Sequence, residues 1–184
     1  MEQLFIFDVD KPYLSMKELL IGGLCVLLIS QILTMSICKL FGFDVNKDVD
    51  NQQDKISKKW KDSGIKLPVI IMSELLGSVI YTPLAEEFIY KFLLMKKILV
   101  ETLNTDIYSS CFIQALFFSL THYVNIITIK QDYNYTILQM ISTFVSGIVG
   151  GISYIYFNSL VPSIIAHIIN NGFVLVDEVL NYVK

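Results

Sequence analysis

Two histidines, His122 and His167, are the only ones in the chain, and both lie within long apolar segments. An acid or base at mid-membrane costs about 2.5–3.5 kcal/mol, so such a residue is a functional hypothesis by default. Phe118 stands four residues before His122 and Asn171 four residues after His167, each on the same helical face as its histidine. Taken singly, His122 is explained by core packing, and His167 with Asn171 by a hydrogen-bond clasp between helices.

Two adjacent glutamates, Glu86 and Glu87, lie in a third apolar segment just after Pro83. Adjacent helical residues point about 100° apart, so the two carboxylates face different neighbours. Glu87 and Lys91 are four residues apart with the acid first, which is the favourable order for an ion pair. Simple charge compensation explains that pair without any catalytic role.

Joined together, these side chains could activate water. A glutamate near one histidine can hold and deprotonate a water molecule. A second histidine, with an asparagine, can donate hydrogen bonds to a developing oxyanion. Two histidines and a glutamate are also a plausible zinc set, with water completing the tetrahedron. The chain lacks the helical zinc motif that places a glutamate between two histidines, and a metal-free mechanism fits the residues equally well.

The elements that must position these residues are membrane helices. The chain has 184 residues, 54% of them hydrophobic, and a mean hydropathy of +0.58, above the apolar share of about 45–50% in soluble domains. Pro83 interrupts the segment between residues 67 and 100 and predicts two short helices, near 68–81 and 84–99. We expect an all-α, polytopic membrane helix bundle of five to six helices. The other predicted spans are 19–43, 107–129, 135–157 and about 163–179.

The chain divides into two regions by composition. Residues 1–66 are predicted to form the first transmembrane helix and a polar loop, and residues 67–184 the membrane core. Lysines of the loop predict that it is cytoplasmic, and Lys96 and Lys97 agree if 68–81 and 84–99 make one out-and-back excursion. Gly147 and Gly151 have the spacing that lets two helices approach closely. The net charge of −3 gives no case for a nucleic-acid partner, which leaves membrane lipids and a peptide or protein substrate.

Three motifs in this order resemble the CPBP family, which comprises type II CAAX endopeptidases and bacteriocin-processing or self-immunity proteases. The family's paired glutamates followed by arginine appear as Glu86-Glu87-Phe88-Ile89-Tyr90-Lys91. Its Phe-to-His motif appears as Phe118-Ser119-Leu120-Thr121-His122, and its His-to-Asn motif as His167-Ile168-Ile169-Asn170-Asn171, after Leu160-Val161-Pro162-Ser163. The resemblance covers about residues 67–182.

The resemblance implies a role for each site residue. Glu86 and His122 would activate the water, His167 and Asn171 would stabilise the oxyanion, and Glu87 would support them. Lys91 and Phe118 would be supporting residues. If the family member binds zinc, its ligands would be Glu86, His122 and His167.

Two positions depart from the family pattern. Lys91 replaces arginine, which loses the planar fork that grips a carboxylate at two points. Phe92 stands where a glycine is common.

These observations predict an intramembrane endopeptidase that cleaves a membrane-associated peptide or protein, such as a prenylated C-terminal motif, a bacteriocin leader or a signalling peptide. One alternative is a non-catalytic immunity or scaffold protein that kept the site geometry, which Lys91 and the short chain favour. Another is a small transporter or proton relay, although no internal repeat supports it. The arginine-free composition suggests an AT-rich bacterial genome, and therefore a multi-pass protein of a bacterial cell membrane.

Overall fold

The described part of the protein, residues 14–184 of a computed structural model, is a bundle of helices with no β-strand; the first 13 residues of the predicted N-terminal region lie outside it. Within it, five helices are long and apolar enough to cross a membrane. This confirms the prediction of an all-α, multi-pass membrane bundle. The five are α1 (Met16–Leu40), Leu67–Thr102, Ile107–Thr128, α7 (Tyr133–Phe157) and α8 (Val161–Val183).

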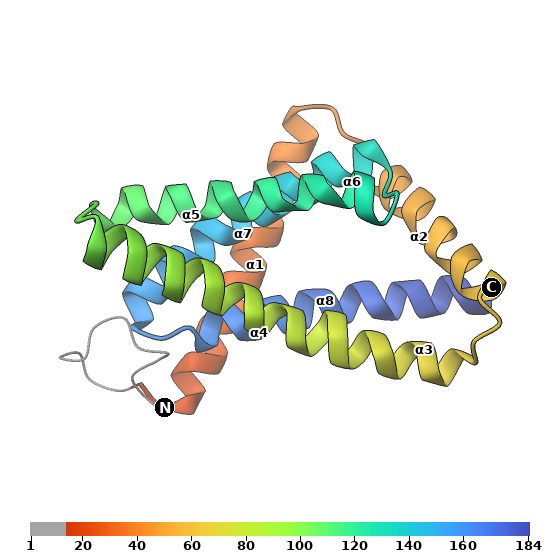
Figure 1. The fold of residues 1–184 in the computed structure, drawn as a ribbon, viewed down its shortest axis with the longest axis horizontal. Coiled ribbons are helices and arrows are strands. Elements are labelled where there is room, and N and C mark those ends of the chain that lie inside the picture. The colour runs from red at the N-terminus through yellow and green to blue at the C-terminus, as the bar shows by residue number, and fades with distance from the viewer. Residues whose placement is uncertain (1–13) are drawn as a thin grey trace.

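Pro83 does not divide the second of these helices, so the prediction of two helices near 68–81 and 84–99 is wrong. The segment runs without a break through α3 (Leu67–Glu74), η2 (Leu75–Tyr81), α4 (Thr82–Glu87) and η3 (Phe88–Thr102), as Figure 1 shows. Proline breaks a regular α-helix because it lacks an N–H and its ring meets the carbonyl four residues earlier. Here the preceding turns are π-helical, and the N–H of Thr82 bonds to Gly77, five residues back. The wider turns carry the helix past the proline.

The continuous helix changes the expected placement of Lys96 and Lys97. They were predicted to return to the side of the lysine-rich loop, but they lie near the opposite end of the 36-residue helix. At roughly 1.5 Å per residue such a helix is about 54 Å long, which exceeds the ~30 Å hydrocarbon core. Its last turns can therefore lie outside the core, where Lys97 pairs with Glu101 at 2.7 Å.

Small residues bring the helices of the core close together. A Cβ on Gly147 of α7 would lie 2.9 Å from the Ala115 Cβ of α5 (Ile107–Thr121), and one on Gly151 would collide with the Cys111 sulfur. The predicted close approach at these two glycines is thus confirmed. Gln114 adds a 2.8 Å hydrogen bond to the Gly147 carbonyl. After α5 the chain continues through η4 (His122–Val124) and α6 (Asn125–Thr128).

The polar segment after the first span is the helix α2 (Val45–Asp62), which lies across one end of the bundle (Figure 1). Its buried side carries Trp60, whose ring packs 6.3 Å from that of Tyr182 on α8. Lys55 reaches Asp132, the residue that caps α7, at 2.9 Å. The α2 helix therefore ties the ends of α7 and α8 together.

Candidate active site

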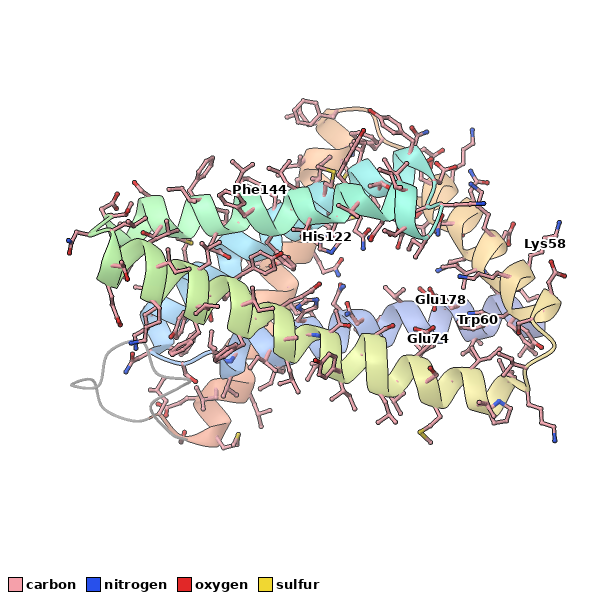
Figure 2. All side chains as sticks on the ribbon, in the orientation of Figure 1. Lys58, Trp60, Glu74, His122, Phe144 and Glu178 are labelled. Atoms are coloured by element: carbon pink, nitrogen blue, oxygen red, sulfur yellow. The ribbon has the colours of Figure 1, made fainter. Side chains whose placement is uncertain are left out.

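The predicted site residues come from three helices that meet inside the bundle. Glu86 and Glu87 end α4, His122 follows α5, and His167 lies in the second turn of α8. In Figure 2, His122 lies on the inner side of its helix, toward α8. The buried surface of each helix therefore carries its polar residues into one region.

Glu87 is the centre of this region and is only 3% exposed. Its Oε2 lies 2.6 Å from the Lys91 Nζ and accepts a 2.5 Å hydrogen bond from the Ser163 hydroxyl. Its Oε1 lies 3.2 Å from the His167 Nδ1. A charge taken out of water is tolerated only when its partners satisfy it in this way. The carboxylate of Glu87 is thus held rigidly by one cation, one hydroxyl and one imidazole.

Lys91 fits its site because α7 has a glycine opposite it. A Cβ on Gly150 would lie 2.8 Å from the Lys91 Cε and 3.1 Å from its Nζ. The ammonium also lies 5.9 Å from the centre of the Phe118 ring. Lys91 and Ser163 both donate to the Oε2 of Glu87, and His167 contacts its Oε1, so three residues together engage the two oxygens that an arginine fork would grip.

Ser163 was not among the predicted site residues, although it stands four residues before His167 and therefore on the same face of α8. The lead-in Leu160-Val161-Pro162-Ser163 was the signal that could have found it. Phe92, the other departure, points elsewhere: its ring stacks on Phe88 at 5.0 Å and is buried in the core.

His167 lies between the two glutamates. A carboxylate can only accept, so the Nδ1 of His167 carries the proton that it shares with Glu87. Its Nε2 faces the Glu86 Oε2 at 3.6 Å. As an imidazolium, His167 would present an Nε2–H to a developing negative charge while Glu87 holds the other side of the ring.

His122 is oriented by its own helix. Its Nδ1 lies 3.0 Å from the Phe118 carbonyl, and because a carbonyl only accepts, this nitrogen carries the proton. In the neutral ring the Nε2 then has a free lone pair and can act as a base. The Phe118 ring lies 5.2 Å from the His122 ring and 6.1 Å from the His167 ring, so it contacts both.

The side chain of Asn171 joins two helices, which is the kind of contact that the alternative of an interhelical hydrogen-bond clasp predicts. Its Nδ2 donates a 2.9 Å hydrogen bond to the main-chain carbonyl of Ser78 on the long helix. The neighbouring Asn170 accepts a 2.7 Å bond from Gln31 of α1. The predicted groups brought together are therefore Glu86, Glu87, Lys91, Phe118, His122 and His167, whereas the amide of Asn171 is engaged with a helix backbone.

The three residues named as possible zinc ligands, Glu86, His122 and His167, do not form a recognisable metal site in the described part of the chain. Between residues 14 and 184, no three carboxylate, thiol or imidazole groups come close enough together to hold a metal ion. The Nδ1 atoms of both histidines bond to protein oxygens, and the Nε2 of His167 faces the Glu86 Oε2 at 3.6 Å. The chemistry below is derived from the side chains alone.

A comparison with protein families matches residues 68–173 to the Rce1-like family, described as type II CAAX prenyl endopeptidase Rce1-like. The matched range is more than half of the chain and contains all of the site residues described above. No curated protein and no solved structure matches the chain.

Proposed function

The chain belongs to the Rce1-like type II CAAX prenyl endopeptidase family, and we propose that it cleaves a membrane-associated peptide or protein with a water molecule activated by Glu86 and His122. The family is one of CAAX-type membrane proteases, and the five long apolar helices make this chain a multi-pass membrane protein. The proposal concerns the residues and the mechanism.

In the proposed reaction, the Glu86 carboxylate and the His122 Nε2 hold a water molecule and take its proton as the oxygen attacks the substrate carbonyl. The new C–O bond places the negative charge on the former carbonyl oxygen. The Nε2–H of His167 donates to this oxyanion, while Glu87 accepts from the other nitrogen of the ring. The proton taken from the water then passes to the leaving amine as the C–N bond breaks.

One observation carries this assignment: the two adjacent carboxylates have different surroundings. Glu87 is buried with Lys91, Ser163 and His167 around it. Glu86 is more exposed, at 26% of its side chain, and faces His167 only at 3.6 Å. Glu87 is buried and already engaged by three partners, whereas Glu86 has an accessible side chain with room for water, so we assign the water to Glu86 and the supporting role to Glu87.

The experiment compares Glu86→Gln and His122→Ala with the wild-type protein in lipid vesicles. The substrates are a farnesylated peptide with a C-terminal CAAX sequence and the same peptide without the lipid, and cleavage is followed by mass spectrometry. Removal of a general base costs about 10²–10⁴-fold in rate, so both variants should lose cleavage while they retain helicity and elute as wild type.

Glu74→Gln is the matched control, because Glu74 lies on the same long helix but bonds to Ser78 instead of the site residues. It should keep most of the activity. Full activity of Glu86→Gln would overturn the assignment. Cleavage of the unprenylated peptide alone would keep the mechanism and exclude a prenyl group as the recognised feature.

Because the chain contains no arginine, which suggests an AT-rich bacterial genome, we also propose that the protein lies in a bacterial cell membrane.

A further inference from the structure

The contact between Asn171 and the long helix begins with a carbonyl group that the helix itself leaves without its usual donor. In a regular α-helix the Ser78 carbonyl would accept from the N–H of Thr82, four residues on. That N–H donates instead to Gly77. In the wider register the next donor in line belongs to Pro83, which has no N–H.

Ser78 lies on the exposed side of the long helix, and a carbonyl without a partner is costly where the surroundings are lipid, which offers no donor. The side chain of Asn171 supplies the missing donor, with its Nδ2 2.9 Å from the Ser78 oxygen. Asn171 therefore replaces, from another helix, the hydrogen bond that the proline removes.

This bond joins the two helices at a level different from that of the reacting groups. Ser78 lies about two turns before Glu86 in the long helix, and Asn171 lies one turn beyond His167 in α8. The other bonds between these helices, from Ser163 and His167, both meet at Glu87. Bonds that converge on one residue restrict rotation about that point only weakly, so the Asn171 bond at a second level helps to fix the axial register of the helices.

We infer that Asn171 is a positioning residue: its amide replaces the N–H that Pro83 lacks and sets Glu86 against His167, without touching the reacting atoms. The inference rests on the proposed function, and it assigns Asn171 a different task from the oxyanion contact that the motif implies. An amide already committed to a main-chain carbonyl is less free to turn toward substrate.

The test restores the missing donor. Asn171→Ala should lower kcat for the farnesylated peptide by about tenfold to a hundredfold, since a small displacement of catalytic groups has effects of that size. Pro83→Ala introduces a backbone N–H within reach of Ser78. The double variant should therefore recover to within about threefold of Pro83→Ala alone. If Asn171 touches the oxyanion, a new N–H at residue 83 cannot replace it, and a double variant as slow as Asn171→Ala would overturn the inference.

A second variant tests the register directly and does not depend on the proline. A Cβ at Gly172 would lie 4.0 Å from the Val79 Cγ1, so Val79→Cys with Gly172→Cys places two thiols near disulfide distance. Asn171→Ala is then added to this double-cysteine protein, and its cleavage rate is compared with that of the double-cysteine protein that retains Asn171. With the thiols reduced, Asn171→Ala should cleave the peptide slowly. With the disulfide formed, its relative rate should rise at least severalfold. Equal losses in both redox states would contradict a positioning role.

Failure of the proposed function gives a different result. If the wild-type protein cleaves neither peptide, the catalytic assignment falls. The contact between Asn171 and Ser78 can still be measured by thermal unfolding of the wild type, Pro83→Ala, Asn171→Ala and the double variant. A lower midpoint for Asn171→Ala that Pro83→Ala partly restores would support the contact. Additive changes in midpoint would show that the two positions do not share the Ser78 carbonyl.

Discussion

The Lys91 ammonium lies 2.6 Å from the Glu87 carboxylate, and both side chains are almost completely buried, at 1% and 4% exposed. The departure from arginine at this position therefore leaves the central ion pair intact. Two features of the chain accommodate the lysine: Gly150 makes room for its head, and the Ser163 hydroxyl supplies a second donor to Glu87. The non-catalytic alternative loses the observation that favoured it most directly.

The first prediction concerns this ion pair. Lys91→Met removes the cation and leaves the buried Glu87 carboxylate without it, which typically costs about 3–5 kcal/mol. We expect a large fall in the thermal unfolding midpoint and a loss of peptide cleavage. Lys97→Met is the control, because Lys97 forms the same kind of pair with Glu101 on the same helix but with both side chains more than 40% exposed. An exposed pair contributes about 0–1 kcal/mol, so similar effects of the two changes would refute the proposed importance of burial.

The second prediction concerns the space opposite Lys91. In Gly150→Ala the new methyl group would lie 2.5 Å from the Ser163 Oγ and 2.8 Å from the Lys91 Cε, so both donors to Glu87 must move. We expect lower stability and slower cleavage. Gly77→Ala is the control, because no atom lies within 4 Å of its Cβ and alanine favours a helix by about 0.5–1 kcal/mol. Wild-type kinetics in Gly150→Ala would show that the Lys91 position does not affect the reaction.

The membrane helices could be predicted from sequence because lipid demands long apolar segments whose backbone groups bond internally. The contact between Glu87 and His167 agrees with the proposal that the motifs share one site. Each of these polar residues lies on an otherwise apolar helix, where another polar side chain is the favourable partner. The continuity of the helix through Pro83 could not be predicted, because π-helical turns have no distinctive residue pattern. A proline within apolar residues reads equally well as a break.

The contacts of Asn171 and Ser163 depend on the register between helices, which the residues of one helix do not reveal. A serine in an apolar helix commonly bonds to a carbonyl of its own preceding turn, and Ser36 does so with Ile32. Only the packing of α8 against α4 shows that Ser163 bonds to Glu87 instead. The Ser78 carbonyl, as a backbone group, leaves no sign in the sequence at all.

The third prediction uses this difference between the serines. Ser163→Ala removes a hydrogen bond to a charged and buried carboxylate, and bonds of this kind contribute about 1.5–3 kcal/mol. We expect a lower unfolding midpoint and a reduced kcat with little change in KM, because Glu87 acts through His167. Ser36→Ala removes a hydroxyl that bonds to its own helix and should change neither quantity. A selective rise in KM for Ser163→Ala would instead indicate contact with the substrate.

The fourth prediction concerns pH and the docking of α2. The hydrogen bond from Lys55 holds the pKa of the Asp132 carboxyl below its usual value. A carboxyl whose pKa is lower in the folded than in the unfolded protein stabilises the folded state. This stabilisation is complete at pH values above the unfolded-state pKa, which is about 4 for aspartate. It is lost as the pH falls through the folded-state pKa. Both side chains are partly exposed, at 55% and 35%, so screening limits the contribution to less than about 1 kcal/mol.

Trp60 reports this docking, because it is the only tryptophan of the chain and packs on Tyr182 beneath α2. In the wild-type protein, the urea concentration that exposes Trp60 should fall between pH 7 and pH 3 by more than it does in Lys55→Gln. At pH 7 the variant should already require less urea. Lys58→Gln removes the same charge from the same helix, but Lys58 points away from the bundle (Figure 2) and should behave as wild type. Parallel pH curves for the wild type and Lys55→Gln would show that the Asp132 pair does not hold α2 in place. The Trp60 contact would then be sufficient, together with the bonds that the Asn181 amide donates to Gln53 and the Asp132 N–H donates to Gln52.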